Sequence, residues 1–313
     1  MLLRILHRTT YRYHGSIDMA QPVDTPCQHV LAHELRISPE PAARSQTPDV
    51  FGNLRTFFSL QSPHETLVVE ADSLVETLEP RPLPDEADWN TLSWERVRNH
   101  FRYRIGAPFD PASEFLFASP YVPRDDAFAT FARPAFSTGL PLLEAARGLM
   151  ERIHTELQYE TASTEVHTPA LQALKQGKGV CQDFAHIMLG CLRSLGLPAR
   201  YVSGYLLTQP PPGKPRLIGA DASHAWVAVY APLPGSTQLA EDDHTEPSGH
   251  WFHFDPTNNR CGWDSPGEDY VQLASGRDFA DVSPMRGVIQ GGARHSLQVG
   301  VTVAPPAELA TIA

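Results

Sequence analysis

The chain of 313 residues is 42% hydrophobic and carries a formal net charge of −11 at pH 7. Its length predicts about two domains, and its apolar content is sufficient for each to bury a core. The sequence contains no run of about 18 apolar residues, which argues against a transmembrane helix. An acidic balance without a basic run argues against binding to nucleic acid or to an anionic membrane surface.

The cysteines are too few and too scattered along the chain for a disulfide scaffold. No CxxC pair occurs among them, which argues against a zinc-ribbon site. The stretch Met1–Arg8 has charges inside its apolar run and no small-residue cleavage site, so we expect a first strand rather than a signal peptide. These features favour a reducing compartment, the cytoplasm. The four cysteines are Cys27, Cys181, Cys191 and Cys261.

Residues 1–80 are predicted to form an antiparallel β-sandwich domain. Short alternating runs rich in β-branched and aromatic residues are separated by turn residues, which is typical of such sandwiches. No catalytic group gathers in this region, so we expect a domain that covers the core or docks a substrate or partner. The predicted strands span residues 4–13, 33–38, 54–60 and 67–78.

Residues 81–139 are predicted to link this domain to the rest of the chain. The stretch 79–88 is rich in proline and acidic residues, as linkers often are. A short helix is expected over residues 89–101, followed by an extended segment with aromatic side chains over residues 109–123.

Residues 140–313 are predicted to form a second domain, to which we also assign a strictly alternating strand at residues 295–303. A helix over residues 140–157 carries apolar residues at helical spacing. A shorter helix is expected over residues 169–176, with Thr168 as its N-cap.

The sequence between 200 and 250 predicts strands and exposed loops. Residues 200–207 are expected to form a strand that is broken at Gly204. The stretch 209–216 holds four prolines and a glycine, and the stretch 235–249 is polar and acidic. We expect both to be loops, and such loops often shape access to a site.

The stretch Gly177–His186 organises the second domain. Two glycines precede Cys181, and an apolar pattern at helical spacing begins directly after it, so Cys181 is predicted to lie in the first turn of a buried helix. Unpaired N–H groups and the helix dipole favour negative charge there, and the thiolate is the nucleophilic form of cysteine. Cys181 is therefore a candidate nucleophile, although a buried structural cysteine would also fit a helix start.

Two later strands carry candidates for the base and the orienting group that a thiolate nucleophile needs. The alternating run 223–230 has His224 at its start, and the run 251–255 ends at Asp255, directly before a proline. If a hairpin pairs these strands, His224 and Asp255 lie side by side. Cys181, His224 and Asp255 would then supply the nucleophile, the base and the orienting carboxylate.

At these residues the chain resembles bacterial transglutaminase-like proteins. The resemblance rests on four motifs in chain order, GVCQDFAH, LPARYVSGY, SHAWVAVY and FDPTNN. It covers roughly residues 140–265, and the N-terminal third is similar to the β domain that precedes this core in the same family. The superfamily also includes papain-like folds. The resemblance implies an α+β fold whose cysteine-bearing helix packs on an antiparallel sheet carrying the histidine and aspartate, with a triad at Cys181, His224 and Asp255.

The resemblance also implies a thiol enzyme that attacks an amide carbonyl and forms a thioester. An amine resolves the thioester in acyl transfer, and water resolves it in a cysteine peptidase or amidase, with the same triad. The expected partner is a peptide or protein amide, with an amine acceptor in the first case, and we expect no cofactor or metal. A non-catalytic binding module on the same fold is a third hypothesis. Gln182 stands where animal transglutaminases have tryptophan, which argues against protein crosslinking.

Two residues of the cysteine helix have competing interpretations. His186 lies five residues after Cys181, about 140° around a helix, so we expect a structural role for it. Asp183 is expected to cap or complement the helix N-terminus.

The region around the aspartate offers weaker alternatives. His253 lies on the same strand face as Asp255 and is an alternative base, ranked below His224. Asp255 with Asn258 and Asn259 loosely resembles a calcium loop, but the glycine and the terminal glutamate of such loops are missing.

Overall fold

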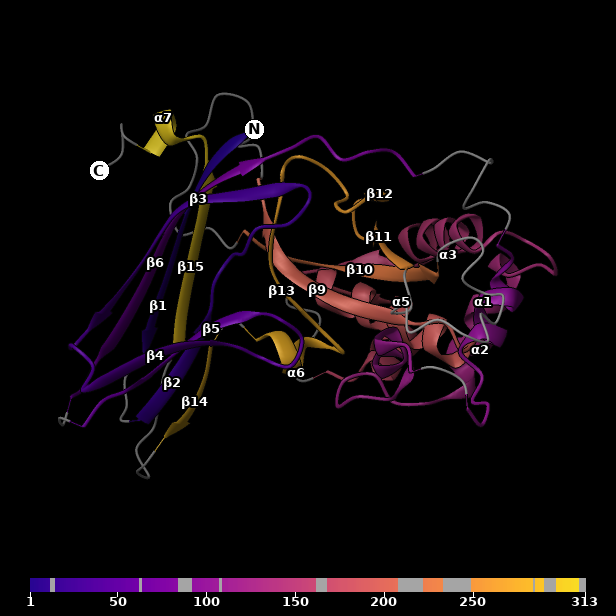
Figure 1. Ribbon diagram of the computed structural model, residues 1–313, viewed down its shortest axis with the longest axis horizontal. Coiled ribbons are helices and arrows are strands. Elements are labelled where there is room, and N and C mark those ends of the chain that lie inside the picture. The colour runs from indigo at the N-terminus through magenta and orange to yellow at the C-terminus, as the bar shows by residue number, and fades with distance from the viewer. Residues whose placement is uncertain are drawn as a thin grey trace.

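The computed structural model describes residues 1–11, 15–61, 64–83, 92–106, 109–161, 168–207, 222–232, 249–283, 285–289 and 297–309. The chain folds into a β-sandwich and, beside it, a mixed α/β core built on an antiparallel sheet (Figure 1). This confirms the expected α+β fold class. The loop expected at 209–216 and most of that expected at 235–249 lie outside the described residues.

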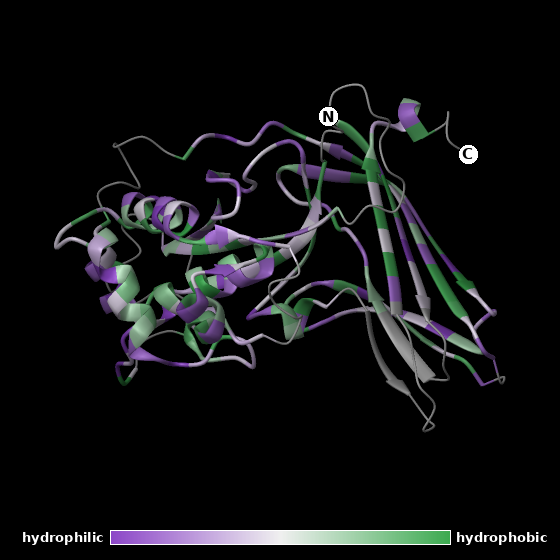
Figure 2. Cartoon of the chain, turned by 180° about the vertical axis from the view of Figure 1, so that it is seen from behind, coloured by the Kyte–Doolittle hydropathy of each residue, from purple (hydrophilic) through white to green (hydrophobic). Residues whose placement is uncertain are grey.

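The sandwich consists of two facing antiparallel sheets in the described part of the chain. Alternating side chains point into the space between them, and Figure 2 shows this alternation as hydrophobic and hydrophilic bands along the strands. The apolar filling comes from Met19, Leu35, Ile37, Phe58, Leu67, Val69 and Ala71. One sheet has the order β15-β1-β6-β3, with strands Leu297–Ala304, Leu2–Tyr11, Leu67–Thr77 and Gln28–Ser38. The other has the order β14-β2-β5-β4, with strands Met285–Ile289, Gly15–Ala20, Leu54–Ser59 and Ala43–Pro48.

The last two strands of the chain belong to the sandwich and not to the core. β15 pairs with β1 from Arg4 opposite Ala304 to Tyr11 opposite Leu297, and β14 pairs with β2. Assigning the C-terminal strand to a 140–313 core was therefore wrong. The alternation of residues 295–303 predicts a strand correctly, but alternation alone does not indicate which sheet a strand joins.

The core sheet has the order β12-β11-β10-β9-β13, with helices packed against it. Its strands are β9 (Ala199–Leu206), β10 (Ser223–Pro232), β11 (Gly249–Asp255), β12 (Arg260–Trp263) and β13 (Tyr270–Gly276). A small parallel pair joins β7 (Gln158–Tyr159) and β8 (Lys178–Gly179). The helices are α1 (Trp94–His100), α2 (Asp126–Ala132), α3 (Leu142–Glu156), α4 (Ala170–Gln176), α5 (Cys181–Ser194), α6 (Phe279–Val282) and α7 (Pro306–Leu309), with 3₁₀ turns at Pro111–Leu116 and Arg133–Ala135.

Helix α5 is the centre of the core. Every residue from Asp183 to Arg193 is buried, and α5 packs against β9, β10 and helices α2, α3 and α4. Its C-terminal end is anchored by the guanidinium of Arg193, which donates to the carbonyl of Ala199 at 2.8 Å and to the hydroxyl of Ser119 at 3.2 Å. The position of the first turn of α5 is therefore fixed by packing along its whole length.

The predicted helices α3 and α4 are present, but the expected N-cap of α4 is wrong. Pro169 occupies the cap position and makes no side-chain hydrogen bond there, so the N-cap lies one residue later than expected. Capping side chains appear elsewhere, where Ser93, Asp125 and Asp278 accept from the first turns of α1, α2 and α6.

Amide side chains of the sandwich join it to β13, the edge strand of the core sheet. The amide of Gln28 donates to the carbonyl of Gln272 at 2.9 Å and accepts from its N–H at 2.8 Å. Asn53 makes the same pair of bonds with Ser275, at 2.8 and 2.7 Å. These side chains satisfy edge groups that a neighbouring strand would otherwise bond.

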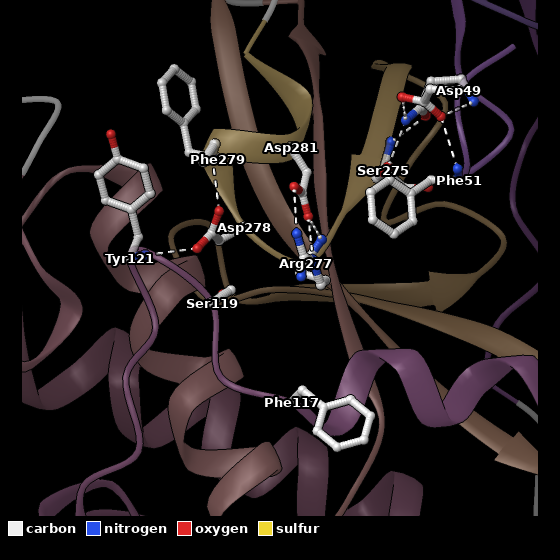
Figure 3. Close-up of polar contacts among 12 residues, drawn as sticks. Asp49, Phe51, Phe117, Ser119, Tyr121, Ser275, Arg277, Asp278, Phe279 and Asp281 are labelled. Atoms are coloured by element: carbon white, nitrogen blue, oxygen red, sulfur yellow. Dashed lines mark hydrogen bonds and ion pairs between the residues drawn. The ribbon is translucent and has the colours of Figure 1, made fainter.

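The turn after β13 holds a second junction, drawn in Figure 3. The carboxylate of Asp278 accepts from the backbone N–H of Tyr121 at 2.7 Å, and Arg277 pairs with Asp281 at 2.8 Å (Figure 3). The expectation of an extended segment over residues 109–123 is wrong for Pro111–Leu116, which form a 3₁₀ turn. The part around Tyr121 is tied to the turn after β13 by its bond to Asp278.

Candidate active site

Cys181 is the first residue of α5, and two glycines shape the chain before it. Gly177 ends α4 with a φ of 68°, in the left-handed region that favours glycine. A Cβ on Gly179 would lie 2.6 Å from the side chain of Asp183, whose carboxylate accepts from the N–H of Val180 at 2.8 Å. Asp183 therefore complements the helix start as expected. The half-buried Cys181 thiol is presented at the N-terminal end of a buried helix.

His224 and Asp255 lie on adjacent antiparallel strands, as the sequence predicts. His224 is the second residue of β10 and Asp255 the last of β11. The Nε2 of His224 donates to Oδ2 of Asp255 at 2.7 Å. The side chain of Cys181 also lies within hydrogen-bonding reach of the His224 ring. Because Nε2 faces Asp255, Nδ1 is the nitrogen left to face the thiol, and the structure brings all three predicted residues together.

The carboxylate of Asp255 is fully buried and accepts five hydrogen bonds from described residues. Oδ1 accepts from the backbone N–H groups of Thr257 and Asn258, at 2.8 and 3.3 Å. Oδ2 accepts from His224, from Nδ2 of Asn258 at 2.7 Å and from the hydroxyl of Tyr270 at 2.6 Å. This set of donors compensates the cost of burying a carboxylate.

The electrostatics of the pair favour a charged imidazolium beside a charged carboxylate. Burial lowers the pKa of His224, but hydrogen bonds to Asp255 and Cys181 outweigh burial and raise that pKa to about 10. Burial raises the pKa of Asp255, but its hydrogen bonds from His224, Tyr270 and Asn258 hold the pKa below the usual value. At neutral pH this site therefore holds a proton on His224.

The wall behind His224 consists of an aromatic side chain and a glycine. The Trp226 ring stacks on the imidazole, with centroids 6.2 Å apart and planes at 25°. Gly204 lies opposite His224 in the ladder between β9 and β10. A Cβ there would come within 2.6 Å of Trp226 and 2.1 Å of the carbonyl oxygen of Val271. The predicted break at Gly204 is wrong, because the strand runs through this residue and uses glycine to admit the indole.

The other histidines near the motifs are held in neutral roles. Burial, and then the charge of Arg200, lower the pKa of His253 to about 3. Burial, and then the charge of Arg193, lower the pKa of His186 to about 3, and its Nε2 accepts from the backbone N–H of Phe279 at 3.2 Å. The structural role expected for His186 is confirmed.

The four cysteines are all free. Burial raises the pKa of the Cys27 thiol to about 11 and also raises the pKa of the fully buried Cys191. Burial likewise raises the pKa of Cys261. Cys181 is thus distinguished from the other thiols by its place at a helix start beside an imidazole.

Two residues that bond Asp255 were not identified as site residues from the sequence. The Asn258 side chain donates to Asp255, so the turn that loosely resembles a calcium loop is closed by its own hydrogen bonds. Tyr270 begins β13, and the aromatic and β-branched residues at its start, Tyr270 and Val271, are a strand signal. That signal does not indicate that β13 pairs with β9, from where the Tyr270 side chain reaches Asp255 on β11.

The described residues contain no group of three or more His, Cys, Asp or Glu side chains that could hold a metal ion. Among the described helices, none has the length and apolar character needed to cross a bilayer.

Comparison with known proteins identifies the family. Residues 129–256 match the family model of the transglutaminase-like superfamily, and residues 3–76 match that of the bacterial transglutaminase-like N-terminal region. An uncharacterized protein from Mycobacterium tuberculosis is 37% identical over 310 residues, covering 96% of this chain and 92% of that protein. The chain belongs to the transglutaminase-like superfamily.

Two further comparisons extend over nearly the whole chain. An uncharacterized protein from Mycobacterium leprae is 31% identical over 314 residues, covering 96% of this chain and 98% of that protein. A solved structure from Cytophaga hutchinsonii, of a protein proposed to be a cysteine protease, superposes with a TM-score of 0.66 at 21% identity. It covers 98% of this chain and 91% of that one, so the transglutaminase-like fold is shared over the sandwich and the core together.

Proposed function

We propose that this protein is a transglutaminase-like cysteine enzyme that forms a thioester with an amide substrate. The observation that carries the proposal is the arrangement of Cys181, His224 and Asp255. The thiol at the start of α5 lies within hydrogen-bonding reach of a histidine whose other ring nitrogen is 2.7 Å from a buried carboxylate. Nucleophile, base and orienting group are thus connected in the way that thiol catalysis requires.

The first half-reaction follows from these positions. The sulfur of Cys181 attacks the amide carbonyl carbon while the backbone N–H at the start of α5 donates to the developing oxyanion. The C–N bond then breaks, the proton on Nδ1 of His224 passes to the leaving nitrogen, and an amine or ammonia departs. Asp255 keeps Nε2 protonated and stabilises the imidazolium before the proton is transferred.

The second half-reaction determines the class of enzyme. Neutral His224 takes a proton from an incoming amine or water, whose nitrogen or oxygen attacks the thioester carbonyl, and the C–S bond breaks. An amine gives a new amide, whereas water gives a carboxylic acid. We favour acyl transfer, with a peptide or protein amide as donor. Hydrolysis by a cysteine peptidase or amidase is the second candidate, since the C. hutchinsonii protein of the same fold has been proposed to be a cysteine protease.

The first test measures the reactivity of the thiols in the folded protein. Limited treatment with iodoacetamide at pH 7, followed by peptide mapping, is expected to modify Cys181 before Cys27, Cys191 and Cys261, and to do so more slowly in His224→Ala. The three other thiols are internal controls. A Cys181 that is inert in the folded protein would support a binding module instead.

The second test separates transfer from hydrolysis. Casein and a glutamine-containing peptide are incubated with the enzyme, with and without methylamine, and the products are followed by mass. Formation of the methylamide in the sample with methylamine indicates acyl transfer. Free acid or cleaved peptide, both with and without methylamine, indicates hydrolysis. Cys181→Ala is the control for reactions that the enzyme does not catalyse.

A further inference from the structure

The hydroxyl of Tyr270 bonds the same oxygen of Asp255 that His224 bonds. Tyr270 is the first residue of β13, and its side chain is buried. Its hydroxyl donates to Oδ2 at 2.6 Å, while Nε2 of His224 donates to this oxygen at 2.7 Å. The phenol and imidazole rings contact each other directly, with centroids 5.7 Å apart.

Asp255 has enough other partners to stay in place without this phenol. Its Oδ1 is held by two backbone N–H groups, and Nδ2 of Asn258 donates to Oδ2 at 2.7 Å. The bond from Tyr270 is therefore not needed to keep the carboxylate buried and oriented. Its distinctive effect is on Oδ2 itself, because each further donor to an oxygen reduces the negative charge available to the others.

Tyr270 is also held so that it always donates. Burial, and then the charge of Asp255, raise the pKa of Tyr270, so the phenol keeps its proton. The guanidinium of Arg260 lies over the ring at 4.9 Å and is fixed by two bonds of 2.7 Å to Asp269. Among the residues that the structure describes, the titratable groups in contact with His224 are Asp255 from β11, Cys181 from α5 and Tyr270 from β13.

We propose that Tyr270 is a positioning residue whose hydroxyl limits how strongly Asp255 holds the proton of His224. The inference rests on the proposed function, because that reaction requires His224 to give its proton to the leaving nitrogen. A carboxylate oxygen that bonds His224 more strongly retains the proton and slows this step. Competition from Tyr270 for Oδ2 keeps the imidazolium acidic enough to act as a general acid.

The test replaces the tyrosine by phenylalanine, which removes only the hydroxyl. In Tyr270→Phe the pKa of His224 is expected to rise above its parent value of about 10. It is measured by NMR on protein with ¹⁵N-labelled histidine, the signal being assigned by comparison with His224→Gln. A second measurement needs no alkaline sample, because the low-field proton signal of Nε2–H at pH 7 is expected to move further downfield as its bond to Asp255 shortens.

A matched control removes a phenol hydroxyl elsewhere in the same sheet. Tyr230 on β10 is buried, and its hydroxyl bonds the carboxylate of Asp110. Tyr230→Phe thus deletes the same kind of contact away from Asp255 and is expected to leave both His224 signals unchanged. Alkylation of Cys181 by iodoacetamide needs no proton for a leaving nitrogen, so at pH 7 its rate in Tyr270→Phe is expected to stay within about twofold of the parent.

The outcomes distinguish this inference from the proposed function. If Tyr270→Phe leaves the His224 signals where they are in the parent, or moves the pKa down and the proton signal upfield, the inference is wrong. A lower pKa of His224 in Tyr270→Phe would mean that the hydroxyl only keeps His224 and Asp255 in contact. If Cys181 is inert and His224 titrates near the ordinary value of about 6.5 in the parent itself, the proposed function is wrong.

Discussion

The indole N–H of Trp226 donates a hydrogen bond of 2.9 Å to Nδ1 of His253. Nδ1 must therefore be the unprotonated nitrogen of His253, which agrees with the pKa of about 3 for this buried ring. The same indole stacks on His224, so two histidines on neighbouring strands contact one tryptophan in opposite charge states. His253, the alternative base suggested by the sequence, serves instead to hold Trp226 against the site.

This contrast predicts different effects for the two histidines. Cys181→Ala and His224→Ala are each expected to remove nearly all activity while leaving the fold intact, and their losses should not add because the residues act as a unit. His253→Gln keeps an acceptor for Trp226 and is expected to retain most of the Cys181 alkylation rate. Far-ultraviolet circular dichroism controls for folding. Near-parental turnover in either of the first two variants would contradict the assignment.

Asp255→Asn is expected to reduce turnover by about 10²–10⁴-fold, as loss of the orienting carboxylate does in other triads. The donors around both oxygens add a second effect. The asparagine NH₂ group must replace one of the two carboxylate oxygens, and donors surround both. In one orientation it faces the backbone N–H groups, and in the other it faces Tyr270 and Asn258. The melting temperature should therefore fall as well. Unchanged turnover would show that another group orients His224.

Because of His224, the stability of the protein should decrease as the pH rises through the alkaline range. Its folded pKa of about 10 lies above the value of about 6.5 expected in the unfolded chain. The stabilisation that follows is complete below pH 6.5, declines above it and is lost as pH rises through about 10. The difference in melting temperature between parent and His224→Gln should therefore be larger at pH 6 than at pH 10.5. A difference that is constant across this range would mean that the folded pKa is not raised.

Gly204 and Gly148 provide a matched pair of glycine-to-alanine substitutions. Gly204→Ala places a Cβ 2.1 Å from the carbonyl oxygen of Val271, so β9 and β13 must separate. We expect the free energy of unfolding to fall by about 1–3 kcal/mol. Because Gly204 lies opposite His224, alkylation of Cys181 should slow too. In Gly148→Ala, within helix α3, the new methyl meets its nearest atom at 3.6 Å, and a gain of up to about 1 kcal/mol is expected. Thermal denaturation of both variants measures the contrast, and equal stabilities would contradict it.

The sequence predicted those parts of the fold that depend on local pattern. The helix expected at 140–157 is α3, Leu142–Glu156, and the cysteine helix begins at Cys181 because glycines and an apolar period define it. Strands β10 and β11 were predicted from alternation and pair as expected. Their pairing is sufficient to bring His224 to Asp255.

Other features could not be predicted because they depend on contacts distant in the sequence. Strand β4, Ala43–Pro48, has every side chain exposed, so no hydrophobic alternation marks it. The partner of β15 and the donor role of Tyr270 depend on sheet order, which a strand pattern does not specify. At Gly204 the expectation of a break failed because a neighbouring indole, and not a bend in the strand, requires glycine.

The pairing of β1 with β15 has a consequence for the order of folding. Arg4 lies opposite Ala304, which is 300 residues further along the chain (304 − 4). Bringing such distant strands together through a disordered chain is entropically costly and slow. A core that is already compact brings its two ends closer and removes most of that cost. We therefore expect the core to fold first and the sandwich to close last, with β1 exposed as an unpaired strand until β15 reaches it.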